Sequence, residues 1–270
     1  ALNSTADTAN DLDSGTAVAV FAGEVATLGE TVNPAANYTS TGPVCTGTSG
    51  LSGSTLTVGA ADTTIVCTYT NTRKSATLQL KKQWSNAKVG DTAALTATGI
   101  TNSAGAALNS TADTANDLDS GTVVAVFAGE AATLGETVNP AANYTSTGPV
   151  CTGTSGLSGS TLTVGADDTA IVCTYTNTRK SATLQLLKTW VNARVGDAVT
   201  VSATGIVNSA GAQLDAVANV ANETDPGAVV TVYAGEVATL GEGSISGSGA
   251  TYLKSFACTG NSNALAGSVL

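Results

Sequence analysis

The sequence predicts an all-β protein built from tandem β-sandwiches of about seven strands each. Three observations carry this prediction. Thr and Val, which favour extended backbone, recur throughout the 270 residues, whereas aromatic residues make up only 4%. Apolar and polar residues alternate in short runs, and Gly, Asn, Asp or Pro separate most of these runs. Finally, a long block of the sequence returns after 106 residues.

The 106-residue period predicts how the chain is organised. Residues 1–74 match residues 107–180 at all but four positions, and a third, more diverged copy includes residues 229–242. The most polar and basic stretch of the period, Thr-Arg-Lys-Ser, joins two strand-like runs, and we place the boundary after its lysine. We therefore expect a complete sandwich at 75–180, the later part of one at 1–74 and the earlier part of one at 181–270.

So short a linker favours a semi-rigid rod over a flexible string. Because the first residues belong to the middle of a repeat, we expect the chain to be an excerpt or processed product of a longer array.

Seven strands are expected in the complete unit. In the first of them Leu78, Leu80, Lys82 and Trp84 share one face, which indicates that this face is buried. The seven runs are 76–84, 92–99, 123–127, 131–138, 144–151, 160–164 and 170–177. Residues 108–118 can form a helix, but their Ser, Thr, Asp and Asn content favours a loop at least as strongly. Gly-rich stretches such as TGTSGLSGS are expected to be hairpin loops.

The five cysteines lie at matched positions of the repeat. Cys45 and Cys67 are 22 residues apart, as are Cys151 and Cys173, while the counterpart of Cys258 would fall beyond the printed sequence. One matched pair per repeat predicts one disulfide per sandwich, and hence an oxidising location. The alternative is a pair of buried free thiols. Zinc is a poorer candidate because two sulfurs without His do not complete a site.

The composition argues against several classes of function. The net charge of −10, with only ten basic residues, makes a nucleic-acid partner improbable. The absence of His removes imidazole proton transfer and His metal ligation, so we expect no enzyme, no cofactor and no metal. No apolar run is long enough to span a membrane.

Two polar motifs have weaker interpretations. The acidic stretch 113–122, with its copy at 7–16, lacks the ligand spacing of a calcium loop, so a solvated turn is expected. Asn-x-Thr motifs at Asn37 and Asn143 permit glycosylation.

Two stretches of the complete unit, FAGEAATLGETVNPAANYTSTGPVCTG and TLTVGADDTAIVCTYTNTR, resemble the prealbumin-like repeats of bacterial surface proteins. These repeats are related to SpaA-type pilin domains and to the B-type repeats of collagen adhesins. The similarity covers essentially the whole 106-residue unit, and its most specific parts are GETVNPAANY and CTYTNT. The resemblance implies an Ig-like, seven-stranded Greek-key sandwich, strung in tandem on a bacterial surface. It does not imply a particular ligand.

Many domains of that family contain a Lys–Asn isopeptide bond with an acid opposite. Carried over by position, the resemblance implies Lys82, Glu136 and Asn177 in the complete unit. The partial sets in the other copies are Glu30 with Asn71, and Lys188 with Glu242. The chain departs from the family pattern in lacking the usual Gly-Ala-x-Phe element after the first strand.

Strand alternation places all three residues of this set on inward faces. Burial would favour the neutral, nucleophilic amine of Lys82, and a protonated Glu136 could polarise the Asn177 carbonyl. The alternative is an ordinary ion pair between Lys82 and Glu136, with Asn177 beginning the turn between domains.

Two functions follow as hypotheses. The first is a structural repeat region of an extracellular or bacterial cell-surface protein, a stalk, fibre or filament that associates with neighbouring repeats or with itself. The alternative is an adhesin module that recognises a glycan or a protein. The sequence shows no aromatic cluster of the kind that dominates binding surfaces, which favours the first hypothesis.

Overall fold

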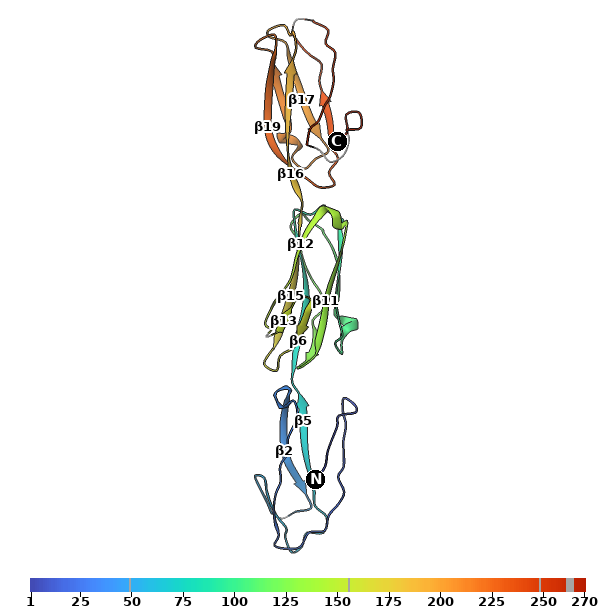
Figure 1. Ribbon diagram of the computed structural model, residues 1–270, viewed down its shortest axis with the longest axis vertical. Coiled ribbons are helices and arrows are strands. Elements are labelled where there is room, and N and C mark those ends of the chain that lie inside the picture. The colour runs from blue at the N-terminus through green and yellow to red at the C-terminus, as the bar shows by residue number, and fades with distance from the viewer. Residues whose placement is uncertain (49, 155, 248, 261–264) are drawn as a thin grey trace.

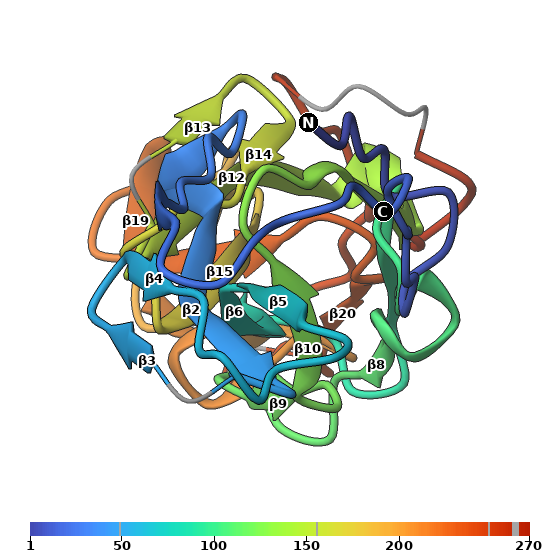
Figure 2. The same ribbon diagram turned by 90° about the horizontal axis from the view of Figure 1, so that it is seen from below.

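The computed structural model describes residues 1–48, 50–154, 156–247, 249–260 and 265–270. It is an elongated, all-β molecule in which three groups of strands, within residues 25–73, 75–179 and 181–242, lie one above another (Figure 1). Seen along the long axis, the three groups overlie one another within one rounded outline (Figure 2). The prediction of an all-β fold is confirmed. In the described part of the chain no helix has the length and apolar character needed to cross a membrane.

The first sheet of the middle group contains its first and last long strands side by side. Its strand order is β10 (Val124–Phe127), β6 (Ser75–Ser85), β15 (Ala170–Arg179) and β12 (Tyr144–Thr152), and β9 (Leu118–Ser120) also pairs with β6. β6 and β15 run parallel, whereas the other pairs of this sheet are antiparallel. In the parallel register Lys82 lies opposite Tyr175, and Trp84 lies opposite Asn177.

The second sheet of the middle group is antiparallel throughout. Its strand order is β13 (Gly156–Ser158), β14 (Thr161–Thr163), β11 (Ala131–Asn139), β7 (Thr92–Thr98) and β8 (Ala107–Thr111). Glu136 lies on β11 opposite Leu95 of β7. Two single-turn 3-10 helices, η2 (Ser103–Gly105) and η3 (Ala141–Asn143), complete the group.

The two sheets of the middle group enclose one core. Every second residue of β6 is buried from Ala76 to Trp84, as the period of a strand requires. The same alternation holds in β15 from Ile171 to Arg179. Leu78 packs in one cluster with Leu95 of the facing sheet, and burying one leucine stabilises the fold by about 2 kcal/mol. This packing makes the middle group a β-sandwich.

The seven expected strands all form, but the structure adds three short ones. Residues 108–111 of the segment 108–118, which was expected to be a helix or loop, belong to strand β8 instead, because they pair with β7. Strand β9 pairs with β6, and strand β13 lies in a stretch expected to be only a hairpin loop. The alternative of a helix at 108–118 is therefore wrong, and residues 112–117 form a loop.

The outer groups contain parts of the same arrangement. The lower group has β1 (Val25–Thr27), β2 (Tyr38–Thr46), β3 (Gly50–Ser52), β4 (Thr55–Thr57) and β5 (Val66–Arg73), with the turn η1 (Ala35–Asn37). The upper group has β16 (Ser181–Trp190), β17 (Ala198–Thr204), β18 (Gln213–Val217), β19 (Glu223–Tyr233) and β20 (Thr239–Glu242), with the turn η4 (Ser209–Gly211). In the upper group two small clusters, centred on Trp190 and on Ala203, form the core.

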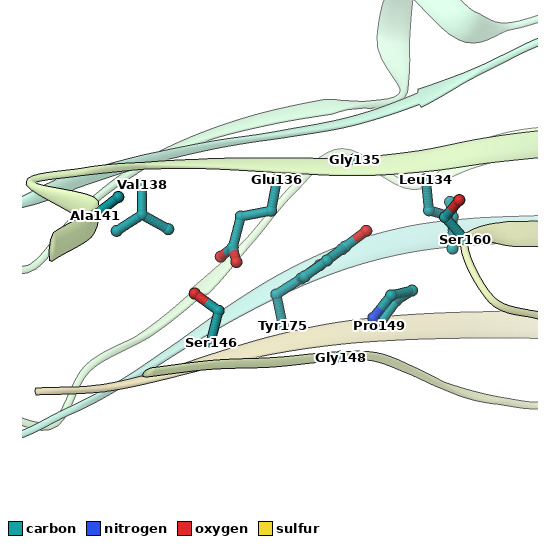
Figure 3. Close-up of a pocket in the computed structure, with 10 residues that line it drawn as sticks. All are labelled: Leu134, Gly135, Glu136, Val138, Ala141, Ser146, Gly148, Pro149, Ser160 and Tyr175. Carbon is teal, nitrogen blue, oxygen red and sulfur yellow. The ribbon is translucent and has the colours of Figure 1, made fainter. Parts of the chain in front are cut away.

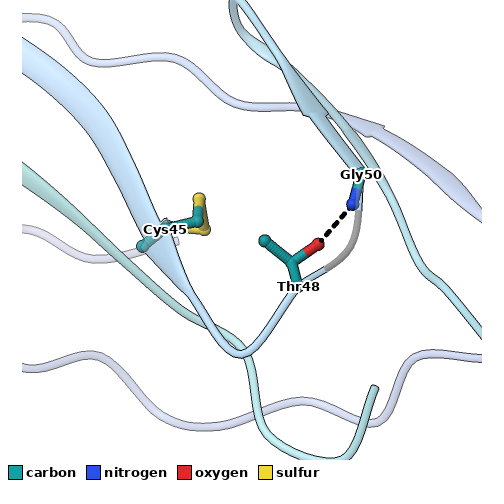
Figure 4. The surroundings of a disulfide bond; sticks show 4 residues. Cys45, Thr48 and Gly50 are labelled. Atoms are coloured by element: carbon teal, nitrogen blue, oxygen red, sulfur yellow. Dashed lines mark hydrogen bonds between the residues drawn. A yellow bond between two sulfur atoms is a disulfide. The ribbon is translucent and has the colours of Figure 1, made fainter. Parts of the chain in front are cut away.

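In the lower and the middle group, a disulfide joins the last strand to the strand that pairs with it in antiparallel orientation. Cys45 of β2 is bonded to Cys67 of β5, and Cys151 of β12 is bonded to Cys173 of β15. Next to the first disulfide, the Gly50 N–H donates a hydrogen bond of 3.1 Å to the Thr48 hydroxyl (Figure 4). Cys258 is a free, half-buried thiol beside the second cluster of the upper group.

Candidate functional site

A lysine occupies the core of the middle group. Lys82 continues the buried face of β6 after Leu78 and Leu80, and its side chain is 0% exposed. Its Nζ donates a hydrogen bond of 3.1 Å to the Gln83 carbonyl and lies 4.2 Å from the centre of the Trp84 ring. Burial lowers the pKa of the Lys82 ammonium below its ordinary value, while the nearby Glu136 opposes this shift. The environment therefore moves Lys82 toward the neutral amine, the form that can act as a nucleophile.

One carboxylate oxygen of Glu136 contacts both other members of the predicted set. Lys82 Nζ lies 3.3 Å from Glu136 Oε1, and Asn177 Nδ2 donates a hydrogen bond of 3.1 Å to the same oxygen. Glu136 belongs to the facing sheet, so its side chain reaches across the sandwich to strands β6 and β15. The structure thus brings together Lys82, Glu136 and Asn177, which are far apart in the sequence.

Asn177 presents its carbonyl without a partner. The residue is 0% exposed, and within the described structure its Oδ1 accepts no hydrogen bond. Leaving a buried acceptor unsatisfied ordinarily costs about 1–3 kcal/mol. An electrophilic amide carbon, a buried amine and a carboxyl group that touches both nitrogens are the groups required for amide exchange.

A shallow groove leads to this site. It has a volume of about 370 Å³ and lies between β11 and the β12–β15 pair, with Glu136, Ser146, Pro149 and Tyr175 among its lining residues. In Figure 3 the Glu136, Ser146 and Tyr175 side chains project into the space between the two sheets. Of the three residues in the set, Glu136 is the one that lines the groove.

The surroundings of Lys82 contain functional groups that sequence reasoning missed. The Trp84 indole N–H donates a hydrogen bond of 2.8 Å to the Ser110 hydroxyl, which donates one of 2.5 Å to Asp119. Asp119 is the cross-strand neighbour of Lys82 on β9. In the upper group the indole N–H of the equivalent Trp190 donates a hydrogen bond of 3.1 Å directly to Asp225. The signal was available, because these tryptophans and aspartates recur with the 106-residue period.

A tyrosine that the sequence analysis did not single out orients the ring of Trp84. The Tyr144 ring packs edge-on against Trp84 at 5.3 Å, and its hydroxyl donates a hydrogen bond of 2.6 Å to Asp91. The same hydroxyl accepts a bond of 3.1 Å from the Lys88 N–H. Trp190, Tyr252 and Asp197 repeat this arrangement in the upper group.

In each of the other copies the two members of the partial set also contact each other. In the lower group Asn71 Nδ2 donates a hydrogen bond of 2.6 Å to Glu30 Oε1, and Ser40 donates one to Asn71 Oδ1. In the upper group Lys188 Nζ lies 2.8 Å from Glu242 Oε1. Of the three groups, the middle one alone brings lysine, acid and asparagine together among the described residues.

Within the acidic stretch 113–122, residues 113–116 form a bend and residues 118–120 belong to strand β9. Asp117 accepts a hydrogen bond of 3.0 Å from the Asp113 N–H and another of 2.9 Å from the Leu118 N–H. No group of three or more His, Cys, Asp or Glu suited to a metal occurs among the residues that the structure describes. Asn37 and Asn143 of the Asn-x-Thr motifs are both half-buried.

Comparison with known proteins gives little further guidance. No family model matches the chain, and no curated protein matches it. Among solved structures, it is similar to a chain in the structure of the streptococcal ancillary pilin, with 12% sequence identity and a TM-score of 0.21. The match covers 62% of this chain and 53% of that one, so it spans about half of the pilin chain. At this TM-score the likeness carries no argument about function.

Proposed function

We propose that this chain is a repeat region of a bacterial surface or extracellular fibre, and that the unit 75–180 closes itself with an isopeptide bond between Lys82 and Asn177. The observation that supports the bond best is the shared contact of Lys82 Nζ and Asn177 Nδ2 with Glu136 Oε1. The near-identical tandem copies, the end-to-end stacking of the three groups and the two disulfides support the extracellular fibre (Figure 1).

The proposed reaction exchanges one amide for another. The neutral Lys82 amine attacks the side-chain carbonyl carbon of Asn177, and the new C–N bond forms as the carbonyl electrons move to Oδ1. Glu136 accepts a proton from the attacking nitrogen and delivers one to Nδ2. The old C–N bond then breaks and ammonia leaves, so the products are a secondary amide and one NH₃. The groove beside Glu136 supplies the exit.

The mass of the intact chain tests the bond. With the disulfides formed, we expect the chain to be lighter than its disulfide-corrected sequence mass by one ammonia. Lys82→Met and Glu136→Ala should each restore the missing mass. Lys188→Met is the matched control, because among the described residues no asparagine equivalent to Asn177 accompanies Lys188 and Glu242, and it should leave the loss unchanged. A parent chain at full mass would rule out the bond.

Micrographs of purified material test the fibre. Straight rods or filaments with a regular axial repeat are expected. Compact monomers that bind glycans would instead favour the adhesin hypothesis, and this result is independent of the mass measurement.

A further inference from the structure

The single residue that separates consecutive strand groups is hydrogen-bonded on both sides. Lys74 follows β5 and precedes β6, and its N–H donates a bond of 2.9 Å to the Asn37 carbonyl of the lower group. Its carbonyl accepts a bond of 2.9 Å from the Ala128 N–H of the middle group. The backbone of Lys74 is therefore paired to both groups, and it has little of the freedom expected of a linker.

An arginine extends the contact from one group to the next. The Nε of Arg73 donates a hydrogen bond of 2.9 Å to the Ala128 carbonyl, and its guanidinium lies 5.7 Å from the centre of the Phe127 ring. Ala128 thus bonds across the junction through both its N–H and its carbonyl. A planar guanidinium can donate and stack at the same time, which an ammonium cannot do equally well.

A glycine allows the two surfaces to approach closely. A Cβ placed on Gly129 would lie 2.5 Å from Asn37 Nδ2, which is shorter than any ordinary contact. Gly129 also has a φ of +83°, a conformation that side chains other than glycine rarely adopt. The Asn37 side chain is therefore packed directly against the backbone of the next group.

The second junction repeats each of these contacts. Lys180 bonds to the Asn143 carbonyl and to the Ala234 N–H, both at 2.9 Å. Arg179 donates a bond of 2.8 Å to the Ala234 carbonyl and lies 5.7 Å from the Tyr233 ring. A Cβ on Gly235 would again lie 2.5 Å from the asparagine amide nitrogen. The same contacts form at both junctions although Tyr233 occupies the position that Phe127 has in the preceding copy.

We propose that this junction is a specific docking interface between consecutive copies of the repeat. One face is the Asn and the Arg-Lys pair at the end of a repeat, namely Asn37 with Arg73 and Lys74, or Asn143 with Arg179 and Lys180. The other face is the aromatic-Ala-Gly turn of the next copy, residues 127–129 or 233–235. The partner of each face is thus a second copy of the same unit, held at one fixed orientation.

The orientation follows from the chemistry of the contact. Arg179 is only 4% exposed, and a buried guanidinium needs partners that hold it in place. Because the same contacts recur at both junctions, each step along an array should repeat the same rotation. The inference depends on neither the Lys82–Asn177 bond nor the location of the protein.

Hydrogen exchange of the 270-residue chain tests the interface. Arg73→Ala should accelerate exchange at the Lys74 and Ala128 amides by about tenfold and leave the second junction unchanged, because a hydrogen bond to a charged group is lost. Arg179→Ala should do the converse at the Lys180 and Ala234 amides. Each variant is therefore the control for the other, and Arg194→Ala, which removes an exposed arginine, should alter neither junction.

Small-angle scattering supplies the second measurement. The double variant Arg73→Ala/Arg179→Ala should show a broader distribution of interatomic distances and a lower mean extension than the parent chain. If the alanine variants do not fold, Arg→Lys at the same positions replaces them, and a smaller acceleration is expected because lysine lacks the planar fork. Folded variants with parental exchange and parental scattering would overturn the interface.

Discussion

Lys82 is tolerated in the core because polar and aromatic neighbours contact its Nζ, whether that atom is charged or neutral. The nitrogen has the Gln83 carbonyl, the Glu136 carboxylate and the face of the Trp84 ring within reach. Removing either member of the Lys82–Glu136 pair leaves the other one buried with one partner fewer, which destabilises the fold. Lys82→Met and Glu136→Ala should therefore each lower the free energy of unfolding as well as restore the missing mass.

Two tyrosines make the middle group sensitive to alkaline pH. Burial raises the pKa of Tyr144 to about 12, with its hydrogen bond to Asp91 adding to the shift. Burial also raises the pKa of Tyr175 to about 12, with the Glu136 charge adding to it. An unfolded tyrosine has a pKa of about 10, so above that pH the folded state binds more protons than the unfolded state. The stabilisation is complete below about pH 10 and is lost between about pH 10 and pH 12.

The measurement is the tyrosinate absorbance together with the free energy of unfolding at rising pH. Tyr144→Phe and Tyr175→Phe should each remove part of the late absorbance step and part of the alkaline loss of stability. Ionisation of all six tyrosines in one step near pH 10 would contradict the environments described for these two.

At the residue scale, the sequence predicts the direction of a side chain where that direction follows from strand alternation. The inward faces of Lys82, Glu136 and Asn177 could be predicted because side chains alternate between the faces of a strand. The hydrogen-bonded chain from Trp84 to Asp119 could not, because it depends on the register between β6 and β9. That register is a property of two separate segments and is absent from either segment alone.

At the scale of elements, the disulfides connect neighbours that are already paired. Cys151 and Cys173 lie directly opposite each other in the β12–β15 ladder. Replacing both by serine should lower the free energy of unfolding of the middle group by roughly 3 kcal/mol, the value expected for closing a loop of this length. Denaturant unfolding of the oxidised chain measures this.

Cys258→Ser is the matched control for this change, because it removes a cysteine without removing a bond. Its effect on the middle group should be negligible. Equal stability of the parent and the double variant would mean that the ladder between β12 and β15 alone determines the stability.

The long strands were predictable, and the short ones were not, for a physical reason. β6 and β15 alternate between buried and exposed residues over their whole length, so the period is visible in the sequence. β8, β9 and β13 consist of three to five residues, too few to show a period. Their backbone becomes extended because β7, β6 and β14 offer pairing partners.

For the whole molecule, the three groups differ in how completely they enclose a core. Among the described residues of 1–74, the apolar side chains that are buried are Leu56 and Val58, and Phe21 is 70% exposed. The middle group buries a cluster that spans both of its sheets. Stability should therefore be concentrated in the middle group.

Limited proteolysis tests this difference. A resistant fragment that includes residues 75–180 should accumulate first, while residues 1–24, where no strand forms, should be cleaved early. Mass spectrometry of the fragments identifies the boundaries. Survival of the 1–74 segment for as long as the middle group would contradict the expected order.

The parallel pairing of β6 and β15 has a mechanical consequence. β6 begins at the junction with the lower group, and β15 ends at the junction with the upper group. Tension applied along the rod would therefore pull these two neighbouring strands in opposite directions along their common ladder. Separation would have to shear the pairs from Ala170–Thr77 to Thr178–Ser85 together instead of opening them one at a time. A covalent bond from Lys82 to Asn177 would lie across this same ladder and transmit the load without extending the unit.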